Sequence, residues 1–504
     1  MHFNNLRGNW LSAALVFATG SAFLLFGYDQ GVLGGLIENK SFERTFNYPN
    51  ATVIGHITAT YDLGCFAGAI LCMMYGDRVG RRLSIGLGCT TLTIGAILQT
   101  ASYNVPQMIV GRFVAGLGNG ANTTAVPVWQ AEVFPPELRG RMMVLQLVLN
   151  QLGNVTAQWL NFGLGYIGNK DVSWRFPLAF QIFYALATVS LMPWCPDSPR
   201  WLIQRGRTTE ARAVLARLRD KDQDDPEIVT LHESAVHSVD HEMEVSRPKW
   251  SALLRNDDLQ TARRVFLGAG TQFMQQWGGI NVINYYLPVV FGSLNVSRRM
   301  SLILSACNAI NLMFSACVGI VVIESVGRKR LMELGAIGQG VCFALVAGGL
   351  SANQDKWSIV AISFVFVFFT VFGLSWISIP WMYPAEVNTQ QWRNRGAGIA
   401  TATNWICNYA VVLVTPVGTD SIGWRFYIIF AVLNISFVPI VWLFYEETAR
   451  RSLEDIDLCF EQKYAKASRA SLGDENVKQA QQARDGTSEW DEDIGKLSQS
   501  KQDV

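Results

Sequence analysis

The sequence predicts an all-α membrane protein with twelve transmembrane helices in two pseudo-symmetric six-helix halves. Hydrophobic residues make up 50% of the 504 residues and charged residues only 16%, a composition typical of a polytopic membrane protein. Apolar runs long enough to cross the ~30 Å hydrocarbon core of a bilayer occur twelve times. Motifs of the first half of the chain recur in the second half, which indicates an internal repeat.

Six apolar runs precede a charged segment and six follow it. The runs start near Leu11, Val53, Leu83, Pro106, Met142 and Phe176, and then near Val265, Met300, Leu331, Ser358, Gly396 and Trp424. We therefore expect an N-terminal bundle over residues 1–195 and a C-terminal bundle over 265–456. Residues 196–264 read as a linker of short amphipathic helices, and the polar residues 457–504 as a disordered tail.

The short connections indicate an orientation. Basic residues such as Arg82, Arg141 and Lys329 gather in the connections on one side of the predicted bundle. By the positive-inside rule, both termini and the linker are expected in the cytoplasm, and we expect a multi-pass plasma-membrane protein. Two sequons, at Asn50 and Asn295, then lie outside as candidate glycosylation acceptors.

Charged motifs at the ends of the runs are repeated between the halves. Asp77-Arg-Val-Gly-Arg-Arg follows the second run, and Glu324-Ser-Val-Gly-Arg-Lys follows the eighth. The repeat predicts a substrate site between the halves and salt bridges between helices at the inner ends, which hold one conformation closed. The predicted network comprises Asp77, Arg81, Glu132, Arg139, Glu324, Arg328, Glu386 and Arg393.

The stretch from Phe23 to Gly35, FLLFGYDQGVLGG, places a carboxylate inside the first apolar run. An ionised aspartate at the bilayer centre costs roughly 2.5 to 3.5 kcal/mol, so such residues usually face a cavity and have a partner. We interpret Asp29 as a proton or substrate site. The alternative is a helix-end aspartate that reaches interfacial water or pairs for structure. The glycines of this stretch favour close packing of the helix or a bend.

Several motifs, taken in order, carry a family resemblance. They are GDRVGRR at 76–82, PVWQAEVFPPELRGR at 127–141, PDSPRWL at 196–202, QQWGGIN at 275–281, ESVGRKR at 324–330, PWMYPAE at 380–386 and NWICN at 404–408. From about Phe26 to Ile456 the chain resembles a sugar porter of the major facilitator superfamily, which implies the major facilitator fold. FGYDQG, YDLGCFAG and PVWQAE also resemble a fungal branch with proton-coupled transporters of sugars and of glycerol.

The resemblance implies a set of solute contacts, and the residue types fit a sugar. Amides donate and accept hydrogen bonds as sugar hydroxyls do, and aromatic rings suit the apolar face of a sugar. The matching positions are Gln275, Gln276, Asn281, Asn311, Trp381, Asn404, Trp405 and Asn408. Tyr285 and Tyr286 match the outer gate of the family. Gly278 and Gly279 predict an irregular helix between the first and third of these amides.

Proton coupling is implied by a second match. Arg112, in GRFVAGLGNG, corresponds to the buried arginine that pairs with the first-span aspartate in proton symporters of the family. We hypothesise that protonation of Asp29 releases Arg112 and permits the outward-facing state. The neighbouring GLGNG is expected to allow tight helix packing rather than to bind phosphate.

Two residues depart from the family pattern. Leu147 stands in the fifth run where many hexose porters carry a sugar-contacting glutamine, with Gln146 and Gln151 nearby. Asp62 stands in the second run where sugar porters commonly carry a small polar residue. We favour a structural acceptor at Asp62 over a second titrating group, because only Asp29 has a predicted cationic partner.

The predicted function is import of a monosaccharide, a hexose or pentose, with protons by alternating access. The alternatives are a proton-coupled glycerol or polyol transporter, an uncoupled sugar facilitator and, least favoured, a sugar sensor. No catalytic, cofactor or metal constellation is recognisable, since His232, His237 and His241 lie in the charged linker without other ligands. The net charge of +1 gives no sign of a nucleic-acid partner, and we expect a monomer in the lipid bilayer.

Overall fold

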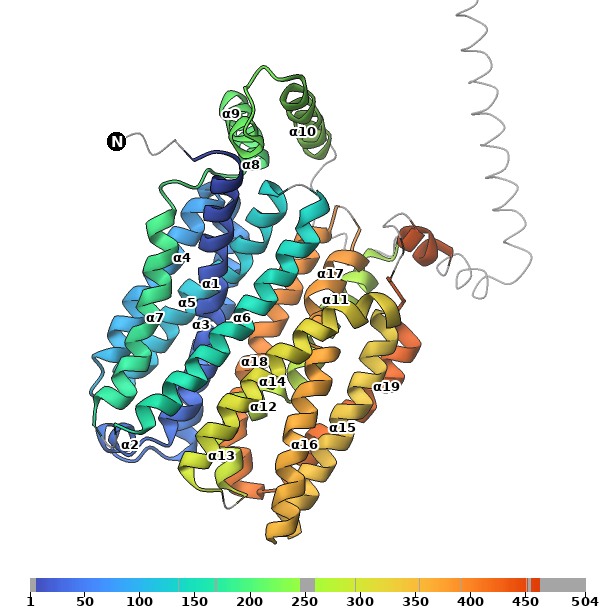
Figure 1. Ribbon diagram of the computed structural model, residues 1–504. Coiled ribbons are helices and arrows are strands. Elements are labelled where there is room, and N and C mark those ends of the chain that lie inside the picture. Colours follow the sequence, from blue (N-terminus) through green and yellow to red (C-terminus); the bar gives the residue numbers. More distant parts are fainter. Residues whose placement is uncertain are drawn as a thin grey trace, which may run out of the picture.

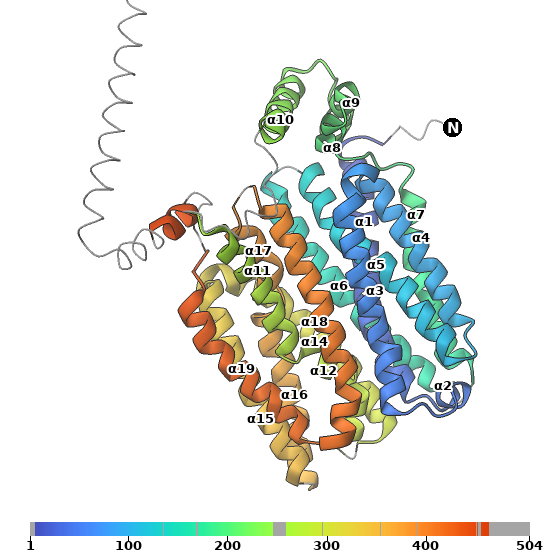
Figure 2. The same ribbon diagram turned by 180° about the vertical axis from the view of Figure 1, so that it is seen from behind.

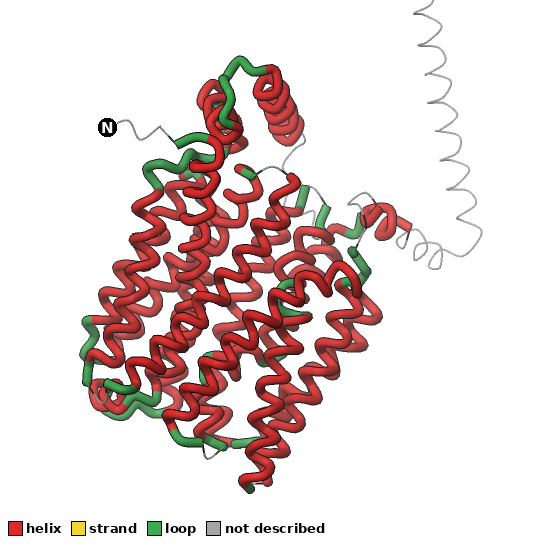
Figure 3. The backbone as a smooth tube through the Cα atoms, in the orientation of Figure 1, coloured by secondary structure: helices red, strands yellow, loops and turns green. Residues whose placement is uncertain are grey.

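The computed structural model describes residues 6–134, 136–167, 170–244, 259–294, 296–352, 354–389, 391–449, 451 and 455–462. Within these ranges all regular structure is helical (Figure 3). The first half contains α1 (Gly8–Ile37), α2 (Lys40–Thr45), α3 (Ala51–Val79), α4 (Arg81–Thr100), α5 (Val105–Val133), α6 (Pro136–Gly165) and α7 (Val172–Leu191). The linker contains α8 (Pro199–Gln204), α9 (Thr208–Arg219) and α10 (Pro226–Glu244).

The second half repeats this order with two broken spans. Its helices are α11 (Thr261–Trp277), α12 (Ile280–Asn284), α13 (Leu287–Gly292), α14 (Arg298–Val326), α15 (Arg328–Ala352), α16 (Asp355–Leu374), α17 (Ile379–Val387), α18 (Arg393–Ile422) and α19 (Arg425–Phe444). The segments α11 to α13 together form the seventh span, and α16 and α17 together form the tenth. A further short helix covers residues 455–462.

The two halves stand side by side as two helical bundles (Figures 1 and 2). The short helices α8, α9 and α10 lie at one end of the molecule, which we call the linker end. Helix α2 lies at the opposite end, which we call the α2 end. The halves contact each other where α3 packs on α18 and where α6 packs on α14. These two contacts are equivalent under the repeat, because each joins the second span of one half to the fifth span of the other.

Hydropathy alone recognises only part of the bundle. Among the described residues, eight helical segments are long and apolar enough to span a membrane, and α5, α6, α7 and α11 are not among them. These four lie within the same bundles and complete the twelve spans (Figure 1). For α6 and α11 the reason why hydropathy misses them is physical. Both helices carry rows of buried amide side chains, which lower their mean hydropathy.

Close helix packing depends on the glycines noted in the sequence. A Cβ atom at Gly27 would lie 1.7 Å from the Asn150 carbonyl oxygen on α6, so only glycine allows this crossing of α1 and α6. In GLGNG, a Cβ atom at Gly116 would lie 2.0 Å from the carbonyl oxygen of Tyr61 on α3. GLGNG therefore serves tight packing of α5 against α3, as expected.

The seventh span breaks where Gly278 and Gly279 predict an irregularity. α11 ends at Trp277, and Gly279 adopts a φ of +88°, which residues with a side chain rarely adopt. A Cβ atom at Gly279 would also lie 2.6 Å from the Phe343 ring. The break turns the chain so that amides of α11 and of α12 can approach one another.

The repeated charges form two equivalent clusters at the linker end. In the first half Arg81 makes a bidentate pair with Glu132, with distances of 3.0 Å, and a 2.8 Å pair with Asp77. In the second half Arg328 pairs with Glu386 at 3.1 Å and with Glu324 at 2.9 Å. Each arginine thus joins three consecutive spans.

A third acid completes each cluster. Asp197 accepts hydrogen bonds from the backbone N–H groups of Arg81 and Arg82, and Glu447 accepts them from those of Arg328 and Lys329. Each ion pair described at these positions joins helices of one half and does not link the two halves. From the sequence we expected a network that also holds one conformation of the protein closed. The side chain of Arg139 lies outside the described residues. Arg393 lines the cavity described below and forms no ion pair with any described residue.

The ordered chain continues past the predicted start of the tail at residue 457. In the helix at 455–462, Phe460 is buried against the second half, and the buried Arg264 guanidinium lies 4.3 Å from the centre of its ring. Arg264 also forms an ion pair with Asp457. These contacts hold the helix against the start of α11. The rest of the predicted tail lies outside the described residues.

We expect Gly279→Ala to lower the stability of the protein. A residue with a Cβ atom costs roughly 1 to 2 kcal/mol in the left-handed region, and the Phe343 ring must also move. Thermal unfolding of the purified protein in detergent measures the loss. Gly163→Ala is the matched control, because no atom lies within 4 Å of its added Cβ. Equal melting temperatures for the two variants would contradict the assigned role of Gly279.

Arg81→Ala should also destabilise the protein. Removing the arginine leaves the nearly buried Glu132 without its cation, which costs roughly 3 kcal/mol for a buried pair. The same unfolding measurement tests this expectation. Glu210→Gln, which breaks the exposed pair of Glu210 with Arg207 in the linker, should leave the melting temperature unchanged. A melting temperature of Arg81→Ala equal to that of the wild type would show that the cluster adds nothing to stability.

Candidate functional site

A cavity of about 1590 Å³ lies between the two halves. Near its mouth it is lined by Gly8, Arg200 and Arg219, so it opens at the linker end. Its inner part reaches Gln30 on α1 and Asn284 on α12. The volume exceeds the roughly 300 to 1,000 Å³ of a typical ligand site, because it includes the open entrance as well as the inner part.

Amides of α11 and α18 form one wall of the inner cavity. Asn404 donates hydrogen bonds to the side-chain oxygens of Gln275, at 3.1 Å, and of Gln272, at 2.6 Å. Gln275 and Gln272 in turn donate to the backbone oxygens of Trp376 and Pro380, at 2.7 and 2.8 Å. The broken tenth span thus exposes backbone acceptors that hold these glutamines in place.

A second set of amides runs from the cavity into the protein. Asn281 donates to Gln276 Oε1 at 2.8 Å and to Asn408 Oδ1 at 2.7 Å. Gln276 and Asn281 line the cavity, whereas Asn408 is buried behind them. Asn408 donates in turn to Asp62 Oδ1 on α3, at 3.0 Å. The amides on either side of the seventh-span break are therefore linked to a carboxylate of the first half.

The structure places some of the aromatic and amide positions implied by the resemblance at the cavity and others away from it. Five of the eight predicted contacts line the cavity, and they are Gln275, Gln276, Asn281, Trp381 and Asn404. Trp405 and Asn408 lie buried behind this wall, and the Trp405 ring packs edge-on against Phe26 with centroids 5.5 Å apart. Asn311 points into the second half, where it donates to the Phe366 carbonyl at 3.0 Å and accepts from Thr370. Asn311 therefore packs α14 against α16 and does not line the cavity.

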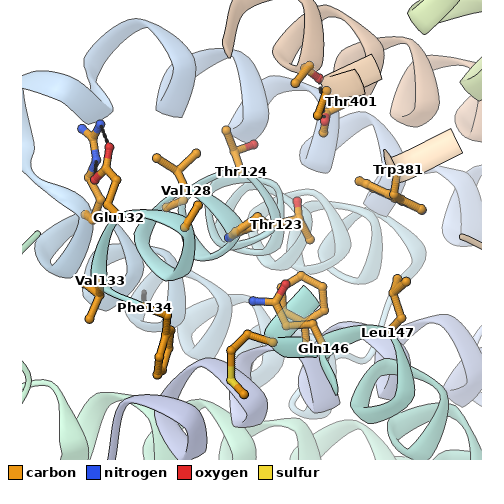
Figure 4. Close-up of a pocket in the computed structure, with 18 of the residues that line it drawn as sticks. Thr123, Thr124, Val128, Glu132, Val133, Phe134, Gln146, Leu147, Trp381 and Thr401 are labelled. Atoms are coloured by element: carbon orange, nitrogen blue, oxygen red, sulfur yellow. Dashed lines mark hydrogen bonds and ion pairs between the residues drawn. The ribbon is translucent and has the colours of Figure 1, made fainter. Parts of the chain in front are cut away.

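The opposite wall is formed by α6, and two of its four cavity-lining amides, Asn150 and Asn154, were not named from the sequence. Gln146, Leu147, Asn150, Gln151 and Asn154 all line the cavity. In Figure 4, Gln146 and Leu147 of the first half and Trp381 of the second half lie around the same space. Amides at positions 146, 150 and 154 share one helix face, since residues four apart are neighbours. The recurrence of amides at every fourth residue of a membrane span was the signal in the sequence that could have identified this wall.

Leu147 itself faces the cavity, and an amide follows one turn later. Gln151 is buried, lines the cavity and lies four residues after Leu147. Within the described part of the chain its Oε1 atom has no hydrogen-bond partner, and neither do Asn150 Nδ2, Asn154 Oδ1 and Gln146 Nε2. The α6 wall therefore keeps donors and acceptors available for a polar solute, despite the leucine.

Asp29 is completely buried on α1 and does not form an ion pair with Arg112. Its Oδ2 atom accepts a 2.8 Å hydrogen bond from the Tyr61 hydroxyl on α3. The Arg112 guanidinium lies over the Tyr61 ring, 4.3 Å from its centre, and donates to the Thr58 carbonyl at 3.3 Å. The direct pair implied by the resemblance is therefore replaced, in this conformation, by contacts through the tyrosine.

Asp29 and Arg112 nevertheless both keep atoms that can form further hydrogen bonds. Asp29 Oδ1 has no partner, and Arg112 Nε and Nη1 have none among the described residues. A buried carboxylate and a buried guanidinium with unsatisfied atoms are costly inside a bilayer. This cost is what we expect of groups that are paired differently in another conformation.

At the α2 end the halves are closed by Asp62 and two tyrosines. Tyr285 donates to Asp62 Oδ1 at 3.2 Å, and Tyr286 donates to the Val412 carbonyl on α18 at 3.1 Å. Both tyrosines are buried, as an outer gate in its closed state requires. Asp62 thus accepts from a hydroxyl, which is the structural role favoured for it from the sequence. Nearby, burial raises the pKa of the Glu38 carboxyl, and the charge of Arg298 opposes this rise.

The linker histidines and the candidate glycosylation positions add little to this site. No group of histidine, cysteine and acidic side chains suited to a metal ion occurs in the part of the chain that the structure describes. Asn50 caps α3 by accepting a hydrogen bond from the Val53 N–H at 2.9 Å. Asn295 and the side chain of His241 lie outside the described residues.

Comparison with known proteins agrees with this architecture. The family described as Sugar (and other) transporter matches residues 13–460. The MFS-type transporter oryC of Aspergillus oryzae is 41% identical, with 90% of this chain and 86% of that protein covered. The sugar transporter STL1 of Saccharomyces cerevisiae is 38% identical, with 91% and 83% covered.

A solved structure shares the fold. The proton:xylose symporter XylE, bound to 6-bromo-6-deoxy-D-glucose, superposes with a TM-score of 0.73 at 22% identity, over 89% of this chain and 98% of that one. The major facilitator fold predicted from the sequence is thereby confirmed. With its membrane-spanning bundle and a family match over most of its length, this chain belongs to the sugar transporter family of the major facilitator superfamily and is a multi-pass membrane transporter, not an enzyme.

Proposed function

We propose that this protein imports a monosaccharide together with protons by alternating access. The observation that carries the proposal is Asp29, a fully buried carboxylate in a membrane span, which has no ion pair and one oxygen without a partner among the residues that the structure describes. A carboxylate in this setting is a natural proton acceptor, because protonation removes the cost of its buried charge. Asp29 lies on the same helix as the cavity-lining Gln30, one residue away.

The cavity supplies the contacts that a sugar needs. Gln275 and Asn404 on one wall and Asn150 and Gln151 on the other offer donors and acceptors to several hydroxyl groups. Trp381 offers a ring for the C–H face of the solute. Because the walls belong to different halves, a bound sugar contacts both halves and biases their relative position.

Proton movement is coupled through Tyr61. With Asp29 ionised, the carboxylate can accept from Tyr61 or pair with Arg112, whose free N–H groups lie against the same ring. Protonation of Asp29 removes the negative charge that holds Arg112, so the equilibrium between these arrangements depends on the proton. We retain the part of the hypothesis in which protonation of Asp29 accompanies the change to the outward-facing state, whereas Arg112 is already apart from Asp29 in the conformation described here.

The linker end faces the cytoplasm in our proposal, and the plasma membrane is the host membrane. The repeated arginines of both halves cluster at the linker end, as the positive-inside rule requires of a cytoplasmic face. With this orientation the conformation described here is open inward, and Tyr285 and Tyr286 belong to the closed outer gate. A monomer suffices, since both walls of the cavity come from one chain.

The proton-coupling proposal predicts a loss of coupling in Asp29→Asn. Addition of the transported sugar to cells expressing the wild type should alkalinise an unbuffered medium, whereas the variant should exchange labelled sugar without moving protons. A panel of hexoses, pentoses and polyols identifies the solute. Glu210→Gln is the matched control, because its carboxylate is exposed in the linker. Sugar entry without alkalinisation in the wild type would instead make the protein an uncoupled facilitator.

The sugar-binding proposal predicts a higher KM in Asn404→Ala. Loss of one well-placed amide that contacts a solute hydroxyl should raise KM for the identified sugar about tenfold. Uptake of labelled sugar, corrected for the amount of protein at the membrane, measures the change. Asn122→Ala is the control, because Asn122 is a buried amide that contacts Cys89 rather than the cavity. An unchanged KM in Asn404→Ala would remove Asn404 from the solute site.

A further inference from the structure

A second buried carboxylate, Asp62 on α3, joins the two halves. It is fully buried, and its Oδ1 atom accepts hydrogen bonds from Asn408 on α18 at 3.0 Å and from Tyr285 at 3.2 Å. Both donors belong to the second half, whereas Asp62 belongs to the first. A buried acceptor with two donors from the opposite half is a costly contact to break, because separating the halves leaves buried polar atoms without their partners.

This contact is connected to the solute cavity by an unbroken series of side-chain hydrogen bonds. Gln276 accepts from Asn281, Asn281 also donates to Asn408, and Asn408 donates to Asp62. Gln276 and Asn281 line the cavity, but Asn408, Asp62 and Tyr285 do not. The series therefore begins where a solute binds and ends where the halves meet at the closed α2 end.

Asp62 also adjoins the proton site. The preceding residue, Tyr61, donates to Asp29 and lies under the guanidinium of Arg112. One turn of α3 thus contacts the proton acceptor through Tyr61 and the second half through Asp62. A movement of α3 that alters one of these contacts alters the other, because the two residues share a rigid helix backbone.

We propose that Asp62 is a positioning residue whose hydrogen bonds to Asn408 and Tyr285, together called the Asp62 latch, hold the α2 end closed and respond to solute at Asn281. The proposal deepens the transport function above and rests on it for the role of the solute. Opening of the α2 end must separate α3 from α12 and α18 and so must break both bonds of the latch. The latch therefore favours the conformation that is open at the linker end.

Solute binding loosens the latch by competition at one amide group. The Asn281 amide has two N–H bonds, and Gln276 and Asn408 occupy both. A sugar hydroxyl that accepts from Asn281 must displace one of these partners. If Asn408 is displaced, it loses the hydrogen bond from Asn281 that orients the Asn408 amide toward Asp62. The halves can then separate at the α2 end.

Hydrogen–deuterium exchange of the purified full-length protein, without solute and without a proton gradient, tests the latch. Asp62→Ala and Asn408→Ala should each raise backbone exchange at the α2 end, in residues 51–62, 280–294 and 405–422, and lower it at the linker end. Loss of the hydrogen bond from Asn408 should enlarge the population open at the α2 end about tenfold, and Asp62→Ala, which also loses the bond from Tyr285, should enlarge it at least as much. Exchange rates report that population when opening and closing are fast.

Asp62→Asn is the matched control, because an asparagine oxygen can still accept from Asn408 and Tyr285. Its exchange should stay within about twofold of the wild type, since both acceptor bonds survive. The double variant Asp62→Ala with Asn408→Ala should resemble Asp62→Ala alone, because that substitution already removes the hydrogen bond from Asn408. If Asp62→Ala does not fold, Asn408→Ala and Tyr285→Phe carry the test alone.

Two outcomes would overturn the latch. The first is a backbone exchange rate at the α2 end that is the same in Asn408→Ala and in Asp62→Ala as in the wild type. The second is an Asp62→Asn variant that behaves like Asp62→Ala, since the carboxylate would then act by charge and not as an acceptor. Neither outcome touches the proposed transport function, because that function is tested by sugar uptake and medium alkalinisation and this measurement uses neither.

Discussion

The lack of water inside a bilayer is the constraint on which the rest of this structure depends. Every buried amide and carboxylate must find its partner within the protein or face a cavity that water and solute can enter. The polar groups of this chain accordingly gather between the halves, where Asn404 meets Gln275 and Asn408 meets Asp62. The outer surface instead exposes apolar side chains such as Phe266, Val321 and Trp442.

The two halves satisfy this constraint with different chemistry. The first half holds Asp29, Asp62 and Arg112 within its spans as well as the amides of α6, whereas the second half supplies the amides of α11, α12 and α18. Each half is held together at the linker end by an equivalent arginine cluster, around Arg81 and around Arg328. The repeat therefore serves the rigidity of each half, and the difference between the halves separates the proton site from most of the solute contacts.

Broken helices explain how buried amides are oriented. The breaks after Trp277 and after Leu374 free backbone groups inside the bundle. The carbonyl of Trp376 holds Gln275, and Gly278 accepts from Asn434 on α19. Backbone groups exposed in this way are tolerated only because they are used within the protein or line the cavity. Rigid side chains on movable halves are what alternating access requires.

Local patterns in the sequence were sufficient for much of this description. Apolar length defines the spans, the glycines of the first run predict its close packing or a bend, and Gly278 with Gly279 predicts the break in the seventh span. Of the basic residues of the charged repeat, Arg81 and Arg328 pair at the linker end with the acids named from the sequence, whereas Arg393 forms no ion pair with any described residue. Five of eight implied solute contacts face the cavity, since the family match places them correctly along their helices.

Contacts between distant segments were decided only by the tertiary structure. Asn311 faces α16 and not the cavity, because the rotation of α14 about its axis depends on its neighbours and not on its own sequence. The insertion of Tyr61 between Asp29 and Arg112 depends on how α1, α3 and α5 meet. The partners of Asp62 lie 223 and 346 residues away in the chain. The sequence by itself determined the spans and the residue types inside them, because hydropathy and helical period are local. Which polar groups satisfy one another was decided by packing, because it depends on every helix at once.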